Sequence, residues 1–289
     1  MPDPVPSADP LASLHAGWSS VHPPSEARLV ATVEALRRLV FAELREDGVE
    51  GAGLAAQIRE GFRELVARAF AARGPSASHD SSALPDPSAS DELVERFLAR
   101  APSIAAMLRE DVRAAYDGDP AATCELEIVT CYPGVRALFV HRFAHELDAL
   151  GVPLLPRMMT EFAHRETGID LHPSAAIGRG VFLDHGTGIV VGQTAVIGDG
   201  CRLYQGVTLG ARSFDREPDG SMRRGYKRHP TLEDGVVVYA GATILGGDTV
   251  IGRGSVIAGG VFLTRSVPAG HVVTAPKLEL RMISMGAAI

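Results

Sequence analysis

Cysteine is scarce in this sequence, which has three cysteines among 289 residues. Cys124, Cys131 and Cys201 are odd in number, and no two of them form a Cys-x-x-Cys pair. A disulfide framework and a thiolate zinc site are therefore both disfavoured. We expect all three thiols to be buried as small apolar side chains.

Long apolar runs are also missing. No uninterrupted apolar stretch in the sequence approaches the ~18 residues of a transmembrane helix. The first 27 residues lack the basic-then-apolar order of a signal peptide. These features favour a cytoplasmic protein that does not associate with a membrane.

Basic residues are not in excess. Lys and Arg number 28 and Asp and Glu number 35, which gives a formal net charge of −7. Without a basic run, the chain offers no obvious surface for nucleic acid or for an anionic membrane. We expect its partners to be small molecules and other copies of the chain.

Aliphatic residues recur at every sixth position between Asp170 and Val267. This period matches neither the 3.6 residues of a helix turn nor the alternation of a strand. It is typical of a solenoid in which each hexad forms one side of a triangular coil of about eighteen residues. The repeating positions are Leu171, Ile177, Leu183, Ile189, Val191, Ile197, Leu203, Leu209, Leu232, Val238, Ile244, Leu245, Ile251, Ile257 and Leu263.

A glycine follows many of these aliphatic residues. Glycine suits a corner that needs a positive φ or a close backbone approach. The pairs are Ile177-Gly178, Val191-Gly192, Ile197-Gly198, Leu209-Gly210 and Ile251-Gly252. A β-sandwich would instead require apolar residues at alternate positions and a hairpin turn every 8 to 12 residues.

The sequence predicts an α+β protein in which a helical domain precedes a left-handed parallel β-helix. The predicted parts are a flexible N-terminus over 1–26, a helical domain over 27–168 with a linker at 74–90, the β-helix over 169–268 with an inserted loop at 211–229, and a C-terminal tail over 269–289.

Apolar residues at helical spacing predict helices over 27–47, 53–73, 91–117, 133–150 and 155–166. His141 and His145 lie one turn apart on the fourth of these helices, a spacing that can chelate a metal. No third ligand is evident, so we expect these histidines to be solvated or to face a partner.

Four polar residues interrupt the otherwise aliphatic lattice at its start, namely Asp170, His172, Asp184 and His185. Asp170 and His185 are separated by slightly less than one coil, which predicts that they lie on neighbouring coils near the same corner. A carboxylate in that position would hold the imidazole in one tautomer and make it a better general base. The substrate's own hydroxyl would then be the nucleophile.

Several strings closely resemble the serine O-acetyltransferase family of hexapeptide-repeat enzymes. The resemblance spans about Asp119 to Val267. It is carried by DPA at 119–121, YPGVRAL at 132–138, IDLHPSAAIGRGVFLDH at 169–185, GIVVGQTAVIG at 188–198, YQGVTLG at 204–210 and KRHP at 227–230. The resemblance implies transfer of acetyl from acetyl-CoA to the hydroxyl of L-serine, the first step of cysteine biosynthesis.

The resemblance also implies a role for each matching residue. His185 would be the general base and Asp170 the carboxylate that orients it. Asp119 and Asp184 would hold the amino acid through its ammonium. The carboxylate of the amino acid would face two cationic or donor groups, Arg228 and His229.

In the family, that last pair reaches the site from a neighbouring subunit, which implies a homo-oligomer, either a trimer or a dimer of trimers. Coenzyme A would lie along the later coils, near Gly210, Ala240 and Gly259. Lys277 could meet a coenzyme phosphate. The resemblance implies no metal.

This chain departs from the family at several positions. Gln193 stands where the family usually has glutamate, which removes one negative charge beside the amino-acid pocket. Gly210 is followed by Ala-Arg-Ser instead of Gly-Thr-Gly, one extra residue separates Leu245 from Ile251, and the end of the coil reads TAPKL at 274–278. The sequence ends in Ile289, and family members can insert a C-terminal isoleucine into the active site of O-acetylserine sulfhydrylase.

Three alternatives remain open from the sequence. The acceptor could be another small hydroxyl compound. A metal-dependent hydratase resembling the gamma-type carbonic anhydrases could use His172, His185 and His229, although the short histidine spacing of that family is absent. A catalytically silent assembly scaffold is the third alternative.

Overall fold

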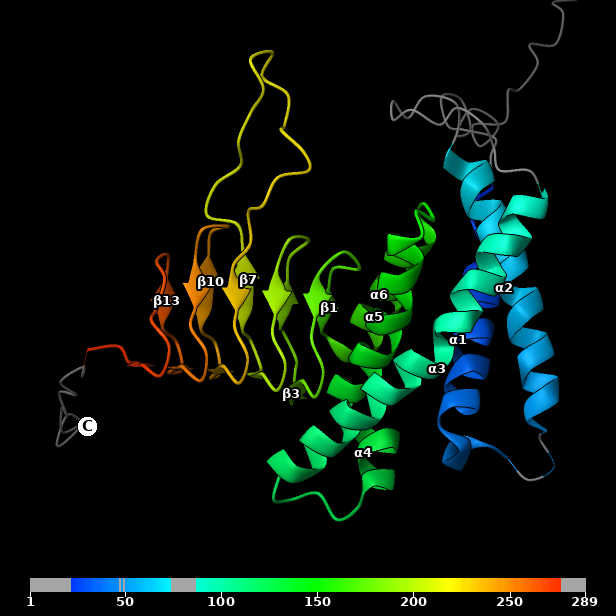
Figure 1. Cartoon of the computed structure of the whole chain (residues 1–289), viewed down its shortest axis with the longest axis horizontal. Coiled ribbons are helices and arrows are strands. Elements are labelled where there is room, and N and C mark those ends of the chain that lie inside the picture. Colours follow the sequence, from blue (N-terminus) through cyan, green and yellow to red (C-terminus); the bar gives the residue numbers. More distant parts are fainter. Residues whose placement is uncertain (1–21, 47, 49, 74–86, 277–289) are drawn as a thin grey trace, which may run out of the picture.

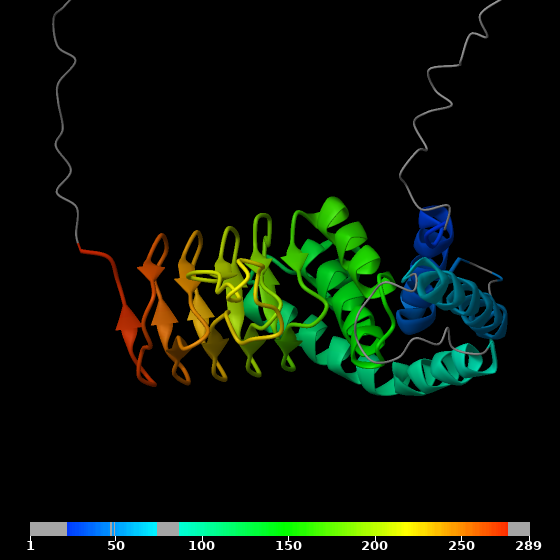
Figure 2. The ribbon, with the colours of Figure 1, turned by 90° about the horizontal axis from the view of Figure 1, so that it is seen from above.

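A computed structural model describes residues 22–46, 48, 50–73 and 87–276 of the chain, with the side chains of 73 and 87–89 left out (Figure 1). Most of the predicted flexible N-terminus and of the predicted linker, together with Lys277 and Ile289, lies outside these residues. The helices gather at one end of an elongated molecule, and the solenoid coils are stacked one after another toward the other end (Figure 2).

Seven helical segments are described. They are α1 (Glu26–Val40), the 3-10 helix η1 (Ala42–Leu44), α2 (Gly51–Arg73), α3 (Pro87–Gly118), α4 (Glu125–Cys131), α5 (Pro133–Ala149) and α6 (Leu155–Thr167). Helices α2, α3, α5 and α6 agree with the predicted ranges to within four residues, whereas α1 ends at Val40, seven residues before the predicted end at 47, and η1 follows it. Helix α4 was not predicted, because seven residues are too few to show a helical period.

Aromatic packing holds the helical part together. Phe62 and Phe97 meet edge to face with ring centroids 4.7 Å apart, and Phe139 and Phe143 do the same at 5.3 Å. All four rings are essentially excluded from water. These helices therefore form a core of their own beside the solenoid.

The solenoid has three faces, each a parallel sheet. Face A contains β1 (Asp170–Leu171), β4 (Val190–Val191), β7 (Thr208–Gly210), β10 (Thr243–Leu245) and β13 (Phe262–Leu263). Face B contains β2 (Ala176–Ile177), β5 (Val196–Ile197), β8 (Thr231–Leu232) and β11 (Val250–Ile251). Face C contains β3 (Phe182–Asp184), β6 (Arg202–Tyr204), β9 (Val237–Val238), β12 (Val256–Ile257) and β14 (Val272–Val273).

The axis of the solenoid is aliphatic, and the predicted hexapeptide-repeat fold is confirmed. Leu203, Leu209, Leu232 and Ile251 are among the side chains there with 0 % exposure. Leu245 was predicted to fill the axis and is instead only half-buried.

The extra residue after Leu245 explains that difference. The chain turns at Gly246, whose φ is 107°, and the buried Thr249 hydroxyl donates to the Leu245 carbonyl at 2.7 Å. Ile244 therefore fills the axis in place of Leu245. The coil also continues to β14, which pairs with β12 beyond the predicted boundary at residue 268.

Close approach between coils explains the glycines that follow the aliphatic residues. A Cβ on Gly178 would lie 2.4 Å from the Asp199 carboxylate and 2.7 Å from the Gly198 carbonyl carbon. Positive φ angles occur at other glycines, such as Gly206. Of the two reasons predicted for these glycines, close approach is the one that applies at Gly178.

A buried ion pair between two helices also forms hydrogen bonds to the solenoid backbone. Arg142 on α5 donates to both carboxylate oxygens of Asp111 on α3, at 2.6 and 2.7 Å. The same guanidinium donates to the carbonyls of Ile177 and Gly178, and Asp111 also accepts from the Val181 N–H. Burial raises the pKa of Asp111, although Arg142 opposes the shift.

Two expectations about polar side chains were wrong. Cys124 and Cys131, at the two ends of the short helix α4, are exposed, and only Cys201 is buried in the solenoid. His141 is 2 % exposed instead of solvated, because its ring is enclosed at the junction and bonds the His172 carbonyl at 3.2 Å. Among the described helices, none is both long and apolar enough to cross a membrane.

Candidate active site

Five of the seven predicted catalytic and substrate-binding residues lie at two corners that bound face A, namely Asp184, His185, Gln193, Arg228 and His229. The His185 corner (residues 184–189) joins face C to face A, and the Arg228 corner (residues 192–194 and 227–230) joins face A to face B. The loop predicted at 211–229 leaves the stack between β7 and β8, at the second of these corners (Figure 1). The insertion leaves the pairing of the coils undisturbed.

His185 has an unusual backbone. Its φ of 54° is one of two positive values for non-glycine residues in the described chain. The turn around it is held by hydrogen bonds from Gly186 N to Asp184 O at 2.6 Å and from Gly188 N to Gly168 O at 2.8 Å. The left-handed backbone carries a side chain that is 75 % exposed. A strained backbone that presents a titratable side chain to solvent is common at functional sites.

Two carboxyl groups surround the His185 imidazole. The Asp184 carboxylate lies 3.9 Å from Nε2 of His185. Burial raises the pKa of Asp184, while His185 acts in the opposite direction. Asp119 also interacts electrostatically with His185, and the Arg202 guanidinium acts on both carboxyl groups, so the corner holds two carboxyl groups and one guanidinium near the imidazole.

Tyr132 holds Asp119 in place and was not identified from the sequence as a site residue. Its hydroxyl donates to Oδ2 of Asp119 at 2.6 Å, and the Ala121 N–H donates to Oδ1 at 2.9 Å. The Tyr132 hydrogen bond is the main reason that the pKa of Asp119 is lowered. The signal available in the sequence was the presence of Tyr132 in the matching string at 132–138.

Asp170 lies on the coil that adjoins the His185 corner, since Gly188 N bonds Gly168 O two residues before it. Its carboxylate is 3.5 Å from the Arg157 guanidinium on α6. Within the described residues, no hydrogen bond or ion pair joins Asp170 to His185. The orienting role of Asp170 therefore stays a prediction.

The same carboxylate belongs to a small group of potential metal ligands. One ligand atom each of Glu161, His164 and Asp170 lie within 4.8 Å of one another. Arg157 pairs with both carboxylates of this group. A guanidinium therefore already supplies the positive charge that these side chains can bind.

The Arg228 corner is built around one threonine hydroxyl. Oγ1 of Thr194 accepts from the N–H groups of Arg228 at 2.9 Å and His229 at 3.1 Å, and it lies 2.9 Å from Nδ1 of His229. Nδ1 also accepts from the Thr194 N–H at 3.1 Å, so Nε2 carries the ring proton. The sequence did not identify Thr194, because its partners are more than thirty residues away.

His229 is neutral at ordinary pH. Its side chain packs over Gly192, where a Cβ would lie 2.1 Å from the ring. Burial, followed by the charge of Arg228, lowers the pKa of His229 to about 4. The corner therefore offers an N–H donor beside a guanidinium, which suits a carboxylate.

Gln193 anchors that guanidinium. Its Oε1 accepts from Nη2 of Arg228 at 2.7 Å. The amide is neutral, so the positive charge of Arg228 remains available to a ligand.

The two corners stand at opposite edges of face A within one chain. The strand between them, from Ile189 to Gly192, spans on the order of 10 Å. His185 and Arg228 therefore flank the outer surface of face A, where Val190 and Phe262 are exposed.

The predicted coenzyme residues do not all come together. Ala240 and Gly259 lie on consecutive coils, with a Cβ on Gly259 only 3.1 Å from the Ala240 carbonyl. They lie on later coils at the same kind of corner as His185, between face C and face A. Tyr204 and Tyr239, in the same row of corners, stack with ring centroids 4.9 Å apart. Gly210 lies at the other edge of face A, on the side of the Arg228 corner, and is close to the Leu245 side chain.

A parallel solenoid of hexads, preceded by helices and carrying a histidine and carboxylates at its corner, defines a hexapeptide-repeat protein of the acyltransferase type. No family model matches the sequence. The plasmid-encoded serine acetyltransferase of Synechococcus elongatus is 53 % identical over 198 residues, which is 68 % of this chain and 62 % of that protein. The serine acetyltransferase of Mycobacterium tuberculosis is 46 % identical over 58 % of this chain and 70 % of its own length.

Solved structures give the same result. Serine acetyltransferase isoform 3 of Entamoeba histolytica, in complex with cysteine, has a TM-score of 0.73 and 31 % identity over 88 % of this chain and 83 % of that one. The Brucella abortus serine acetyltransferase, in complex with coenzyme A, has a TM-score of 0.57 and 30 % identity over 85 % and 93 %. The chain belongs to the serine acetyltransferase family.

Proposed function

We propose that this protein transfers the acetyl group of acetyl-CoA to the hydroxyl of L-serine, giving O-acetylserine for cysteine biosynthesis. The observation that carries the proposal is the opposite character of the two corners of face A. The His185 corner offers the carboxyl groups of Asp119 and Asp184 beside the imidazole, and the Arg228 corner presents a guanidinium beside a neutral histidine. A zwitterionic amino acid needs one corner of each kind.

His185 is the general base in this proposal. Its imidazole takes the proton from the serine hydroxyl while the oxygen attacks the thioester carbonyl. Collapse of the tetrahedral intermediate expels the coenzyme A thiolate, which receives that proton from the imidazolium. A positioned base contributes about 10² to 10⁴ in rate. Asp170 would orient the imidazole, with Arg157 next to it.

A neighbouring subunit would complete the site. Asp119 and Asp184 bind the ammonium of serine, and Arg228 and His229 bind its carboxylate. Since the two corners of one chain are separated by the width of face A, we assign the second pair to an adjacent copy. The assembly is then a trimer or a dimer of trimers, in which each interface carries one site.

Acetyl-CoA would lie along the later coils at the corner between face C and face A, from His185 past Ala240 and Gly259. The small residues there let the pantetheine arm approach the backbone. Gly210 would belong to the opposite wall, and Lys277 would meet a coenzyme phosphate. The coenzyme A complex of the Brucella relative supports the use of an acyl-CoA.

A cytoplasmic location and an interaction with O-acetylserine sulfhydrylase through Ile289 complete the proposal. Retention of the sulfhydrylase by the full-length chain and its loss on removal of Ile289 would support the interaction. Equal retention by both forms would contradict it.

Thiol release from acetyl-CoA, with a panel of acceptors, tests the function. We expect release with L-serine to exceed release with homoserine, threonine and sugars. Gln193 favours one second candidate, an acetyltransferase for another small hydroxyl compound, because the pocket carries one negative charge fewer than the family pattern. A better turnover of any other acceptor than of serine would support that candidate and contradict ours.

A further inference from the structure

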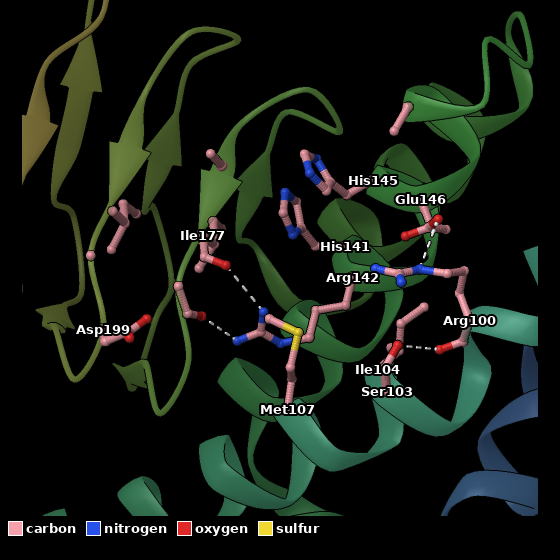
Figure 3. Close-up of a pocket in the computed structure, with 15 residues that line it drawn as sticks. Arg100, Ser103, Ile104, Met107, His141, Arg142, His145, Glu146, Ile177 and Asp199 are labelled. Atoms are coloured by element: carbon pink, nitrogen blue, oxygen red, sulfur yellow. Dashed lines mark hydrogen bonds and ion pairs between the residues drawn. The ribbon is translucent and has the colours of Figure 1, made fainter.

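A cavity lies where the helices meet the solenoid, away from the proposed active site. It has a volume of about 450 Å³ and is bounded by α3, α5 and the first two coils of face B (Figure 3). None of its lining residues belongs to the two corners of the proposed active site. A cavity of this size is within the range of small-molecule sites.

One part of the cavity wall is aliphatic. It is formed by Ile104 and Met107 on α3 and by Ile177 and Ile197 on the solenoid. The three isoleucines are almost fully buried. This surface can receive a branched aliphatic side chain.

The rest of the wall is charged. Arg100 on α3 pairs with Glu146 on α5 at 3.2 Å, and their side chains are 59 % and 20 % exposed. Figure 3 shows this pair on the helix side and Asp199 on the solenoid side. Arg142 is already bound to Asp111 and to two carbonyls, so Arg100 is the cation that this wall can offer to a ligand.

His141 adds a hydrogen-bond acceptor that has no partner. The bond from Nε2 to the His172 carbonyl places the ring proton on Nε2 and leaves a lone pair on Nδ1. Nδ1 is shielded from solvent and has no hydrogen-bond partner among the described residues. Burial lowers the pKa of His141 to about 3, which keeps the ring neutral. A buried acceptor of this kind is stabilised by an incoming N–H donor.

We propose that this cavity binds a zwitterionic amino acid with an aliphatic side chain. Its carboxylate replaces Glu146 on Arg100, and its ammonium lies between Glu146 and the His141 side of the cavity. Its side chain packs on Ile104, Ile177 and Ile197.

The histidines of the cavity wall also contact the turn that follows β1. His141 and His145 bond the carbonyls of His172 and Pro173, at 3.2 and 2.7 Å. These carbonyls belong to the turn after β1, and the His172 imidazole interacts electrostatically with Arg228 and His229. A ligand in the cavity therefore contacts the side chains that hold this turn.

Calorimetric titration of the full-length protein in saturating L-serine tests the proposal. The probes are L-leucine, 3-methylbutylamine, which lacks the carboxylate, and 4-methylpentanoate, which lacks the ammonium. We expect saturable binding of L-leucine and binding at least about tenfold weaker for each singly charged analogue. No saturable leucine binding, or equal affinity for the amine, would overturn the proposal.

Variants locate the binding. Arg100→Gln and the cavity-filling Ala149→Trp, both at exposed positions, should each weaken leucine binding at least about tenfold. Arg113→Gln is the matched control, since it removes an exposed ion pair with Asp117 from the same helix outside the cavity. Unchanged binding in Ala149→Trp would also overturn the proposal. The titration needs no turnover, so its result is independent of whether acetyl transfer to serine is observed.

Discussion

The threonine at the centre of the Arg228 corner provides a quantitative test of the carboxylate site. Thr194→Val keeps the shape of the side chain and removes its hydroxyl. The Arg228 and His229 N–H groups then lose their shared acceptor, and Nδ1 of His229 loses one of its two donors. The pair assigned to the serine carboxylate is no longer held in place.

The size of the effect follows from the number of bonds lost. A buried N–H left without an acceptor costs about 1–3 kcal/mol. Because these groups are only partly buried, we take the lower end for each and expect about 2 kcal/mol in all. If that cost falls on serine binding, the affinity for serine drops about 30-fold.

Steady-state thiol release, measured against serine and against acetyl-CoA, is the assay. We expect KM for serine to rise by about 10- to 30-fold in Thr194→Val, with KM for acetyl-CoA unchanged. Thr194→Ser keeps the hydroxyl and should restore most of the affinity for serine. A valine variant whose KM for serine stays within about twofold of wild type, or whose two KM values rise together, would refute the reasoning.

Two further predictions concern stability. Asp111→Ala should lower the free energy of unfolding by about 3–5 kcal/mol, because it leaves the Arg142 guanidinium buried without its partner. Arg113→Ala, which breaks an exposed pair, should leave the free energy of unfolding nearly unchanged, and equal losses in denaturant titrations would contradict the assigned role of the buried pair. The pKa values of His141 and His229 are lowered from 6.5 to about 3 and about 4, so both rings add stability above pH 6.5 that is lost as the pH falls toward those values. The unfolding free energy should therefore fall between pH 6.5 and 4, less steeply in His141→Gln, and a flat profile would contradict this assignment.

The hexad repeat made the solenoid predictable, because each coil repeats the same local environment and needs no distant information. Asp170, His185 and Arg228 could likewise be singled out from the strings that contain them. Thr194 and Tyr132 also lie in matching strings, but the strings do not show their hydrogen bonds to residues distant in sequence, such as His229 and Asp119.

Burial was harder to predict than the repeat. His141 has the sequence environment of an exposed helical histidine, but the junction between helix and solenoid encloses it. Conversely, Cys124 and Cys131 flank a helix too short to bury both of its ends. Neither outcome can be deduced before the packing of α3 and α5 against the first coil is known.

In the proposed site, one subunit supplies His185 and another supplies Arg228. The direct measurement is serine-dependent thiol release by oligomers formed from His185→Ala chains and Arg228→Ala chains. Each variant alone should be nearly inactive. Co-assembled at equal amounts, about a quarter of the sites in a closed ring should regain both residues, with a corresponding recovery of activity. No recovery in verified mixed oligomers would show that the site does not form between subunits as described.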